Sequence, residues 1–332
     1  MQKIDLHIKH EILPLREPFR ISRGARTEGH VVTVQLMRDN KFGWGEATPY
    51  AHYGETTASV IEQIEQVRQA LENGLTNDEL DALLPAGAAR NAVDCALWDL
   101  RAKERNTSVW QLLGLPKPRP VCTAVTIGVD TTEKMAAKAA LYTNCPLLKV
   151  KLNRDCITEK ITAIHEAAPT SRMIVDPNES WRIETVDELG GFLRSKGVAL
   201  LEQPIPAASS DDLADVESSV PICADEACHT SADLENLVGK YHAINIKLDK
   251  TGGLTQAVIV LNRASELNFE VMVGCMIGSS LAMAPATLIA SSASYVDLDG
   301  PAWLASDREH GLSIDNGIIN APTASLWGGA AP

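Results

Sequence analysis

The sequence predicts an α/β protein in which a barrel of βα repeats follows a separate α+β unit. Three observations support this. Strands and helices alternate after residue 120. The strand ends recur at a near-constant spacing. Residues 1–118 instead place strands first and helices afterwards. Alternating βα order is typical of a parallel sheet, whereas segregated strands and helices are typical of an α+β unit.

The N-terminal unit begins with predicted strands. Residues 3–9 alternate apolar and polar side chains, as a half-buried strand does. Residues 15–26 have no clean period and contain Pro and Gly, so we expect a loop there, followed by a strand over 31–36. Asn40 and Gly43 indicate a hairpin turn into a third strand.

Two helices follow these strands. Thr56 or Thr57 can cap a helix that ends near Asn73. A second helix is expected after Pro85. Residues 115–120 hold three prolines, which cannot continue a helix, so the sequence predicts a boundary near residue 118.

The barrel, expected over residues 119–310, is indicated by eight strand ends that lie 22–27 residues apart. These are Thr126, Lys151, Asp176, Glu202, Asp225, Lys247, Gly274 and Asp297. Such a spacing fits short βα units. No convincing eighth helix follows. The tail, residues 311–332, holds two short strand patterns and could return to the N-terminal unit.

Composition excludes several classes of partner. The formal net charge of -13 argues against nucleic acid or an anionic membrane. No apolar run approaches the roughly 20 residues of a membrane span. The N-terminus lacks the apolar core of a secretory signal. Seven cysteines without CxxC spacing indicate reduced thiols, so we expect a cytoplasmic protein. No role is assigned to any of the eight histidines.

Charged side chains at the strand ends predict one converging site. Parallel barrel strands are buried on both faces, so an unpaired charge there would cost several kcal/mol. Asp176, Glu202 and Asp225 end three consecutive strands, and three carboxylates cannot stay ionised together without a cation. Oxygen ligands favour Mg²⁺. The alternative is a structural ion network of these carboxylates with Lys149, Lys151 and Lys247.

The lysines suggest proton transfer. Lys151 and Lys247 end strands on opposite sides of the metal strands, so each would face one side of a bound α-carbon. Lys149 adds a positive charge that favours the neutral, basic form of a neighbouring lysine. Loss of a proton α to a carboxylate makes an enediolate, which a metal ion stabilises. Removal on one face and return on the other is epimerisation.

These residues resemble the enolase superfamily, specifically the dipeptide epimerases of its muconate-lactonizing-enzyme subgroup. The resemblance rests on Lys149-x-Lys151, the three carboxylates and Lys247, and it extends over nearly the whole chain. Further matching stretches are residues 19–24, 85–91, 222–226, 245–253 and 297–301. The resemblance implies a modified TIM barrel, (β/α)7β, with an N-terminal α+β capping domain, and one Mg²⁺ per subunit.

It also implies substrate contacts. Asp297-x-Asp299 would bind the free α-ammonium of a dipeptide, and period two along a strand does place both carboxylates on one face. A loop near residue 20 would carry an arginine for a glutamate side chain, with Arg23 the first candidate and Arg26 the second. The remaining expected pocket residues are Thr126, Cys275, Met276 and Gly278.

The predicted function is therefore Mg²⁺-dependent epimerisation of dipeptides, with L-Ala-D-Glu and L-Ala-L-Glu preferred, in murein peptide recycling. Alternatives are a dipeptide epimerase of other specificity, a cycloisomerase or o-succinylbenzoate-synthase-type enzyme, and a catalytically silent barrel. The Asp297-x-Asp299 pair counts against the cycloisomerase and o-succinylbenzoate alternatives, whose substrates carry no ammonium. The expected partner is a small dipeptide, with no nucleic acid and no membrane, and a homo-oligomer is left open.

Overall fold

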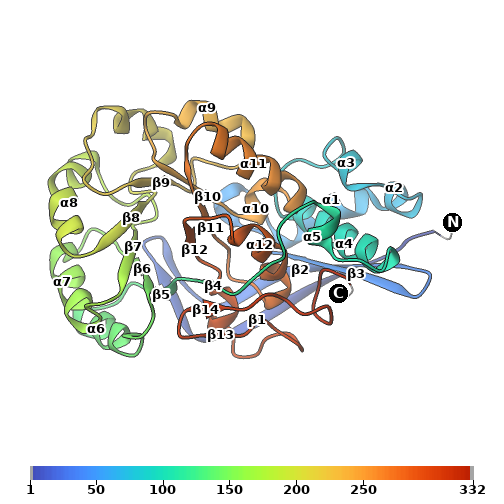
Figure 1. The fold of residues 1–332 in the computed structure, drawn as a ribbon, viewed down its shortest axis with the longest axis horizontal. Coiled ribbons are helices and arrows are strands. Elements are labelled where there is room, and N and C mark those ends of the chain that lie inside the picture. Colours follow the sequence, from blue (N-terminus) through green and yellow to red (C-terminus); the bar gives the residue numbers. More distant parts are fainter. Residues whose placement is uncertain (1–2, 330–332) are drawn as a thin grey trace.

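The protein, described over residues 3–329 by a computed structural model, consists of a barrel and an N-terminal unit that lies beside it (Figure 1). The N-terminal unit has an antiparallel sheet of β1 (Asp5–Ile21), β2 (Gly24–Arg38) and β3 (Lys41–Ala47). Its helices are α1 (Thr57–Gln66), α2 (Arg68–Glu72), α3 (Asn77–Leu80), α4 (Ala88–Glu104) and α5 (Val109–Leu112), with a 3-10 turn η1 (Ala51–Tyr53) before them.

Two glycines bring β3 directly against α4. A Cβ atom on Gly45 would lie 2.0 Å from the carbonyl oxygen of Ala92, and one on Gly43 would lie 2.2 Å from that of Ala96. Only glycine allows so close an approach of strand and helix. The helix in turn presents a nearly fully buried surface to both the sheet and the barrel.

The barrel is a parallel sheet of eight strands in sequential order. They are β5 (Val125–Ile127), β6 (Leu147–Lys151), β7 (Arg172–Asp176), β8 (Val198–Glu202), β9 (Ile222–Ala224), β10 (Ala243–Ile246), β11 (Glu270–Val273) and β12 (Tyr295–Val296). The first and last strands close the ring, because Ala124 N donates to Val296 O at 2.7 Å. The predicted fold class is confirmed, and all eight predicted strand ends lie within a strand or one residue beyond it.

Helices cover the outside of this ring (Figure 1). They are α6 (Thr132–Ala140), α7 (Ile157–Ala167), α8 (Ile183–Ser195), α9 (Leu234–Leu237), α10 (Leu248–Thr251), α11 (Leu254–Glu266) and α12 (Ser280–Ala290). Two 3-10 segments, η2 (Ala207–Asp215) and η3 (Ser231–Asp233), complete the connections around β9. After β12 the described residues, up to 329, form a 3-10 turn, η4 (Gly300–Trp303), and no α-helix. Apolar side chains fill the space between strands and helices as the main core.

The prediction of a loop over residues 15–26 was wrong. This segment is the far end of a long β1–β2 hairpin, with Phe19 paired to Arg26 and Ile21 to Gly24. A register shift between Pro14 and Phe19 accommodates the irregular sequence, and Gly24 has φ +144°, which glycine readily adopts. The hairpin extends from the N-terminal unit across the barrel (Figure 1).

The tail contacts both parts of the molecule. β13 (Ile314–Asp315) and β14 (Ile318–Ile319) form a small sheet with β4 (Val121–Cys122). Farther on, Trp327 Nε1 donates to the carbonyl oxygen of Trp44 at 2.9 Å, and Gly328 N donates to Asp99 at 2.8 Å. Residues 327 and 328 of the tail therefore lie against β3 and α4 of the N-terminal unit.

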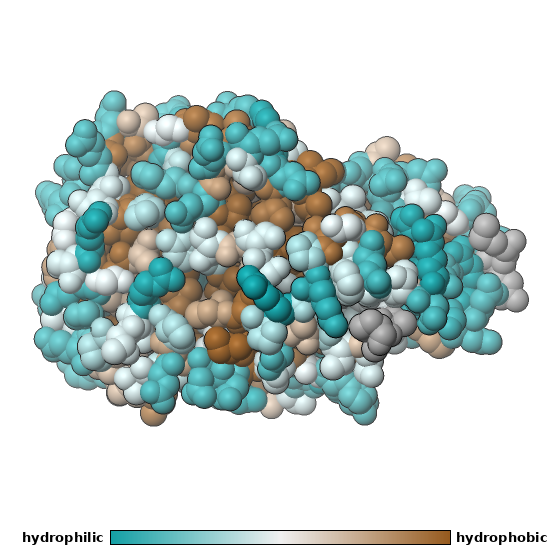
Figure 2. Space-filling model, in the orientation of Figure 1, coloured by the Kyte–Doolittle hydropathy of each residue, from teal (hydrophilic) through white to brown (hydrophobic). Residues whose placement is uncertain are grey.

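The surface is largely polar. In Figure 2 hydrophilic side chains cover most of the visible face, and hydrophobic ones show mainly in its middle, over the barrel and its junction with the N-terminal unit. None of the helices between residues 3 and 329 has the length and hydrophobicity to cross a membrane.

Candidate active site

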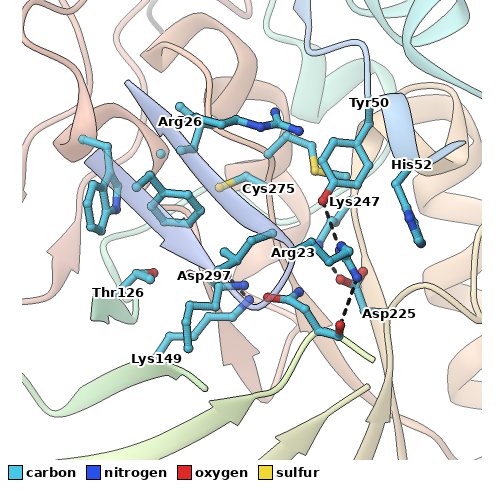
Figure 3. A pocket seen from close by; sticks show the side chains of 18 of the residues that line it. Arg23, Arg26, Tyr50, His52, Thr126, Lys149, Asp225, Lys247, Cys275 and Asp297 are labelled. Atoms are coloured by element: carbon cyan, nitrogen blue, oxygen red, sulfur yellow. Dashed lines mark hydrogen bonds and ion pairs between the residues drawn. The ribbon is translucent and has the colours of Figure 1, made fainter. Parts of the chain in front are cut away.

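A cavity of about 430 Å³ lies where the β1–β2 hairpin and η1 cover the carboxyl ends of the barrel strands (Figure 3). This is the end of a βα barrel at which active sites form. Of the predicted site residues, the following line it: Arg23, Arg26, Thr126, Lys149, Lys151, Asp225, Lys247, Cys275, Met276, Asp297 and Asp299. Asp176 and Glu202 lie at the adjacent strand ends and are fully buried.

Gly278 does not line this cavity, contrary to the prediction. A Cβ atom there would lie 3.2 Å from Glu46 Oε1 and 3.3 Å from the hydroxyl oxygen of Thr48. The segment after β11 turns at this point toward β3, because Glu46 binds the backbone N–H and hydroxyl of Ser279. Gly278 therefore packs against the N-terminal unit.

Asp176, one of the three predicted metal ligands, is ion-paired with the two lysines of β6. Its Oδ2 lies 2.5 Å from Lys151 Nζ and 3.2 Å from Lys149 Nζ, and its Oδ1 accepts the backbone N–H of Asn178. Burial opposes ionisation, but attraction from Lys151 and Lys149 outweighs it and lowers the pKa of Asp176 to about 2. This carboxylate is ionised at neutral pH.

Glu202 is the least satisfied carboxylate of the site. Asn245 Nδ2 donates to its Oε1 at 2.9 Å. Lys149 Nζ lies 2.8 Å from its Oε2, but not in a direction that makes a hydrogen bond, so this buried oxygen has no hydrogen-bond partner among residues 3–329. Burial first, and then repulsion from Asp176, raise the pKa of Glu202 to about 7. A cation beside the Glu202 carboxylate would therefore be stabilised.

Asp225 is held by two lysines. Lys247 Nζ lies 2.5 Å from its Oδ2 and Lys250 Nζ 2.7 Å from its Oδ1. Burial is again outweighed, here by Lys247 and Lys250, and the pKa of Asp225 falls well below its usual range. Lys250 also donates to the carbonyl oxygens of Asp225 and Asn245, at 2.6 and 2.8 Å. Lys250 was not anticipated from the sequence.

The donor set fits a hard, oxygen-binding cation. Three buried carboxylates end neighbouring strands, and Glu202 keeps an unpartnered oxygen and a raised pKa. In the arrangement observed across residues 3–329, no three His, Cys, Asp or Glu side chains are set to hold a metal ion. The lysine ammonium groups contact the carboxylates instead, as in the ion network considered as the alternative.

The pKa values of the buried lysines differ from expectation. From the sequence, the positive charge of Lys149 is expected to favour the neutral form of a neighbouring lysine. Burial does disfavour the charged form of Lys149, but Asp297, Glu202 and Asp176 outweigh burial and raise its pKa well above the ordinary value. The same balance, dominated by Asp225, raises the pKa of Lys247. The carboxylates close to these ammonium groups are the physical reason.

One end of the cavity is acidic. Asp297 Oδ2 accepts from Lys149 at 2.7 Å, and its buried Oδ1 has no hydrogen-bond partner in the described part of the chain. Asp299 Oδ2 accepts the backbone N–H of Thr126 at 2.7 Å, which fixes this carboxylate against β5. Burial and then repulsion from Asp297 raise the pKa of Asp299 to about 7. A cationic donor would satisfy this pair.

The other end is formed around Arg23, at the tip of the hairpin (Figure 3). Its guanidinium lies 2.7 Å from Glu226 Oε1 and 3.1 Å from Glu179 Oε2, and it also donates to the Tyr50 hydroxyl. Arg26 instead lies over the Tyr50 ring, with 5.2 Å between the guanidinium carbon and the ring centroid. Arg23 is therefore held by two ion pairs, whereas Arg26 contacts the Tyr50 ring.

Several lining residues were not predicted from sequence. They are Phe19, Ile21, Tyr50, His52, Tyr53, Asn178, Glu226 and Trp303. His52 was given no role, yet its Nε2 lies 2.9 Å from Glu179. Most of these residues come from the hairpin, η1 and η4, which reach the barrel through long-range contacts. Glu226 and Asn178 carried a local signal, because each closely follows a strand-end carboxylate.

The fold and this site define a barrel enzyme with a covering N-terminal domain, and comparison with protein families agrees. Residues 131–328 match the "Enolase C-terminal domain-like" family, and residues 3–114 match "Mandelate racemase / muconate lactonizing enzyme, N-terminal domain". The chain belongs to the mandelate racemase/muconate lactonizing enzyme family of the enolase superfamily.

The chain is also similar over most of its length to individual epimerases and racemases. The chain is 47% identical to the L-Ala-D/L-Glu epimerase of Escherichia coli, over 93% of this chain and 97% of the relative. It is 44% identical to an N-acetyl-D-glutamate racemase of Pseudoalteromonas, over 90% and 95%.

Solved structures of the same family share this fold. An enolase family member from Agrobacterium tumefaciens with homology to dipeptide epimerases, bound to sodium and L-Ala-L-Glu, matches with a TM-score of 0.95 and 42% identity, over 98% of this chain and 100% of the other. A dipeptide epimerase from Cytophaga hutchinsonii, complexed with Mg and D-Ala-L-Val, matches with a TM-score of 0.90 and 26% identity, over 99% and 95%.

Proposed function

We propose that this protein is an isomerase that epimerises L-Ala-D-Glu and L-Ala-L-Glu at the glutamate α-carbon. The observation that carries the proposal is the position of Lys151 and Lys247. They end or directly follow β6 and β10, which three strands separate in an eight-stranded ring, so they approach the cavity from opposite sides. Two amines placed in this way can remove a proton from one face of an α-carbon and return one to the other.

Asp176, Glu202 and Asp225 would hold one Mg²⁺. When bound, the ion supplies positive charge beside the substrate carboxylate, which becomes more negative as the α-proton leaves. With a cation taking the place of ammonium groups around the carboxylates, Lys151 and Lys247 would be released from their present pairs with Asp176 and Asp225. Freed from these carboxylates, either amine loses a proton more readily.

The remaining contacts set the substrate orientation. Asp297 and Asp299 would receive the α-ammonium of the first residue, and Arg23 the side-chain carboxylate of the second. The hairpin and η1 line the cavity and would limit the access of water to the reacting carbon. Such a dipeptide is the expected product of murein peptide breakdown, and the seven free thiols suit the cytoplasm, where we place the enzyme.

An NMR assay in D₂O with L-Ala-L-Glu and Mg²⁺ tests the proposal. We expect deuterium at the glutamate α-carbon together with the L-Ala-D-Glu diastereomer, and neither after EDTA treatment. N-acetyl-L-glutamate serves as the comparison substrate because one relative is named for N-acetyl-D-glutamate. It has no ammonium for Asp297 and Asp299, so we expect slower turnover. Absence of exchange with any dipeptide would contradict the proposal.

A further inference from the structure

The acidic end of the cavity is bounded by two aromatic side chains, Phe19 from β1 and Trp303 from η4. Their ring centroids lie 4.7 Å apart with an interplanar angle of 83°, an edge-to-face contact. Trp303 is in the turn that begins directly after Asp299, so this wall adjoins the carboxylate pair. In Figure 3 Thr126, whose N–H fixes Asp299, lies across the cavity from His52.

Trp303 separates the cavity from a second space. A smaller pocket of about 150 Å³ lies on the outer side of the indole, and Trp303 lines both spaces. The residues that bound this outer pocket include Glu17, Pro18, Arg20, Asp130 and Lys138. Lys138 Nζ lies 6.0 Å from the indole ring, and Cη2 of the indole lies 3.9 Å from a Cβ built on Gly128.

Phe19 and Trp303 are held in place by hydrogen bonds between β1 and the residues that follow η4. Ala305 N donates to the carbonyl oxygen of Pro14 at 2.8 Å, and Arg16 Nε donates to that of Leu304 at 2.7 Å. Both bonds join β1, which carries Phe19, to the residues that directly follow Trp303. The side chain of Trp303 is only 8% exposed. Aromatic side chains supported in this way cannot move aside without breaking these contacts.

We infer that Phe19 and Trp303 restrict the first residue of the substrate to a small side chain. This rests on the proposed function, in which Asp297 and Asp299 bind the α-ammonium of the first residue. The side chain on the same carbon must then lie within a few ångströms of these carboxylates, at the end of the cavity that the two rings bound. Alanine fits there, whereas leucine or phenylalanine would have to occupy the space of the indole.

Substitution of Trp303 should open the cavity into the outer pocket. We expect wild-type kcat/KM to be at least about 100-fold lower for L-Leu-L-Glu and L-Phe-L-Glu than for L-Ala-L-Glu, since even one methylene in an apolar site changes kcat/KM by roughly 10–200-fold. In Trp303→Ala this ratio should shrink by at least about tenfold. Trp110→Ala, which alters a partly buried tryptophan of α5 that does not line the cavity, should leave it unchanged.

Phe19→Ala provides an independent test should Trp303→Ala fold poorly, because Phe19 lies on the hairpin and not in the barrel core. It should shift the ratio in the same direction. Comparable wild-type turnover of L-Leu-L-Glu and L-Ala-L-Glu, or an unchanged ratio in both folded variants, would overturn the inference. Wild-type inactivity toward every dipeptide would instead contradict the proposed function, so the two failures are distinguishable.

Discussion

Lys250 Nζ lies 2.7 Å from Oδ1 of Asp225 and is almost completely buried, while the other oxygen of the same carboxylate faces Lys247. Lys250 also binds two backbone carbonyl oxygens, so all three of its ammonium protons have acceptors. In the proposed mechanism, this arrangement would let Lys250 hold Asp225 in place once Lys247 no longer pairs with it.

Lys250→Met should therefore weaken both the fold and the metal site. Removing one partner of a buried ion pair costs about 3–5 kcal/mol, and here it also leaves carbonyl oxygens unpaired. Denaturant unfolding should show this loss, and calorimetric titration should show weaker Mg²⁺ binding. Lys41→Met on the exposed start of β3 is the control. Wild-type stability and Mg²⁺ affinity in Lys250→Met would refute this role.

The two-base assignment predicts an asymmetric defect. Lys151→Ala and Lys247→Ala should each lose epimerisation, by roughly 10²–10⁴-fold or more. Each variant keeps the base on one face, so it should still exchange the α-proton of one diastereomer with D₂O. NMR of L-Ala-L-Glu and L-Ala-D-Glu with each variant measures this. If both variants epimerised at near wild-type rates, another pair of groups would have to transfer the proton.

Asp297→Asn should weaken binding of substrates with a free α-ammonium. The unpartnered Oδ1 of Asp297 is the acceptor we assign to that group, and a charge-assisted hydrogen bond contributes about 1.5–3 kcal/mol. KM for L-Ala-L-Glu should rise by about 10- to 100-fold, while turnover of N-acetyl-L-glutamate should change little. An unaltered KM would remove Asp297 from the ammonium site.

The two candidate arginines can be separated by parallel substitutions. Arg23→Met should lower kcat/KM for L-Ala-L-Glu by about 10- to 100-fold and affect L-Ala-L-Leu less. The substitution removes the guanidinium, now paired with Glu226 and Glu179, that we assign to the glutamate side chain of the substrate. Arg26→Met, which loses a contact with the Tyr50 ring, should have a smaller effect. The reverse order would assign glutamate recognition to Arg26.

The stability of the fold should depend on Asp249. This buried carboxyl accepts the backbone N–H of Thr48 and the side chain of Asn91, and burial raises its pKa to about 7. The folded pKa lies above the unfolded value of about 3.9, so its contribution is fully present below about pH 4 and is lost as pH rises through about 7.

Asp249→Asn keeps an acceptor for both donors and cannot ionise. The difference in unfolding free energy between this variant and the wild type should therefore favour the variant increasingly from pH 4 to pH 8, by at most about 4 kcal/mol. Denaturant unfolding at several pH values measures it. A difference that stays constant with pH would show that Asp249 titrates normally in the folded protein.

Particular residues show which parts of the fold and the site can be predicted from the sequence. Lys151, Asp176 and Glu202 were found because each ends a strand, and the alternation and spacing of strands are local patterns. Residues 15–26 were misassigned because their strand character arises from pairing between β1 and β2 across a register shift, which no local period records. Gly278 was misplaced because Ser279, its neighbour, is bound by Glu46, which is 233 residues away.

The sequence by itself determined the βα order, the eight strand ends and the charged groups that meet at one end of the barrel, because alternation, burial and the order of elements are recorded in local sequence patterns. The tertiary structure decided what covers that end. The position of the hairpin over the barrel, the pairing of Arg23 with Glu226 and the contact of Phe19 with Trp303 each join distant segments. Such contacts depend on packing between elements, which is a property of the whole fold.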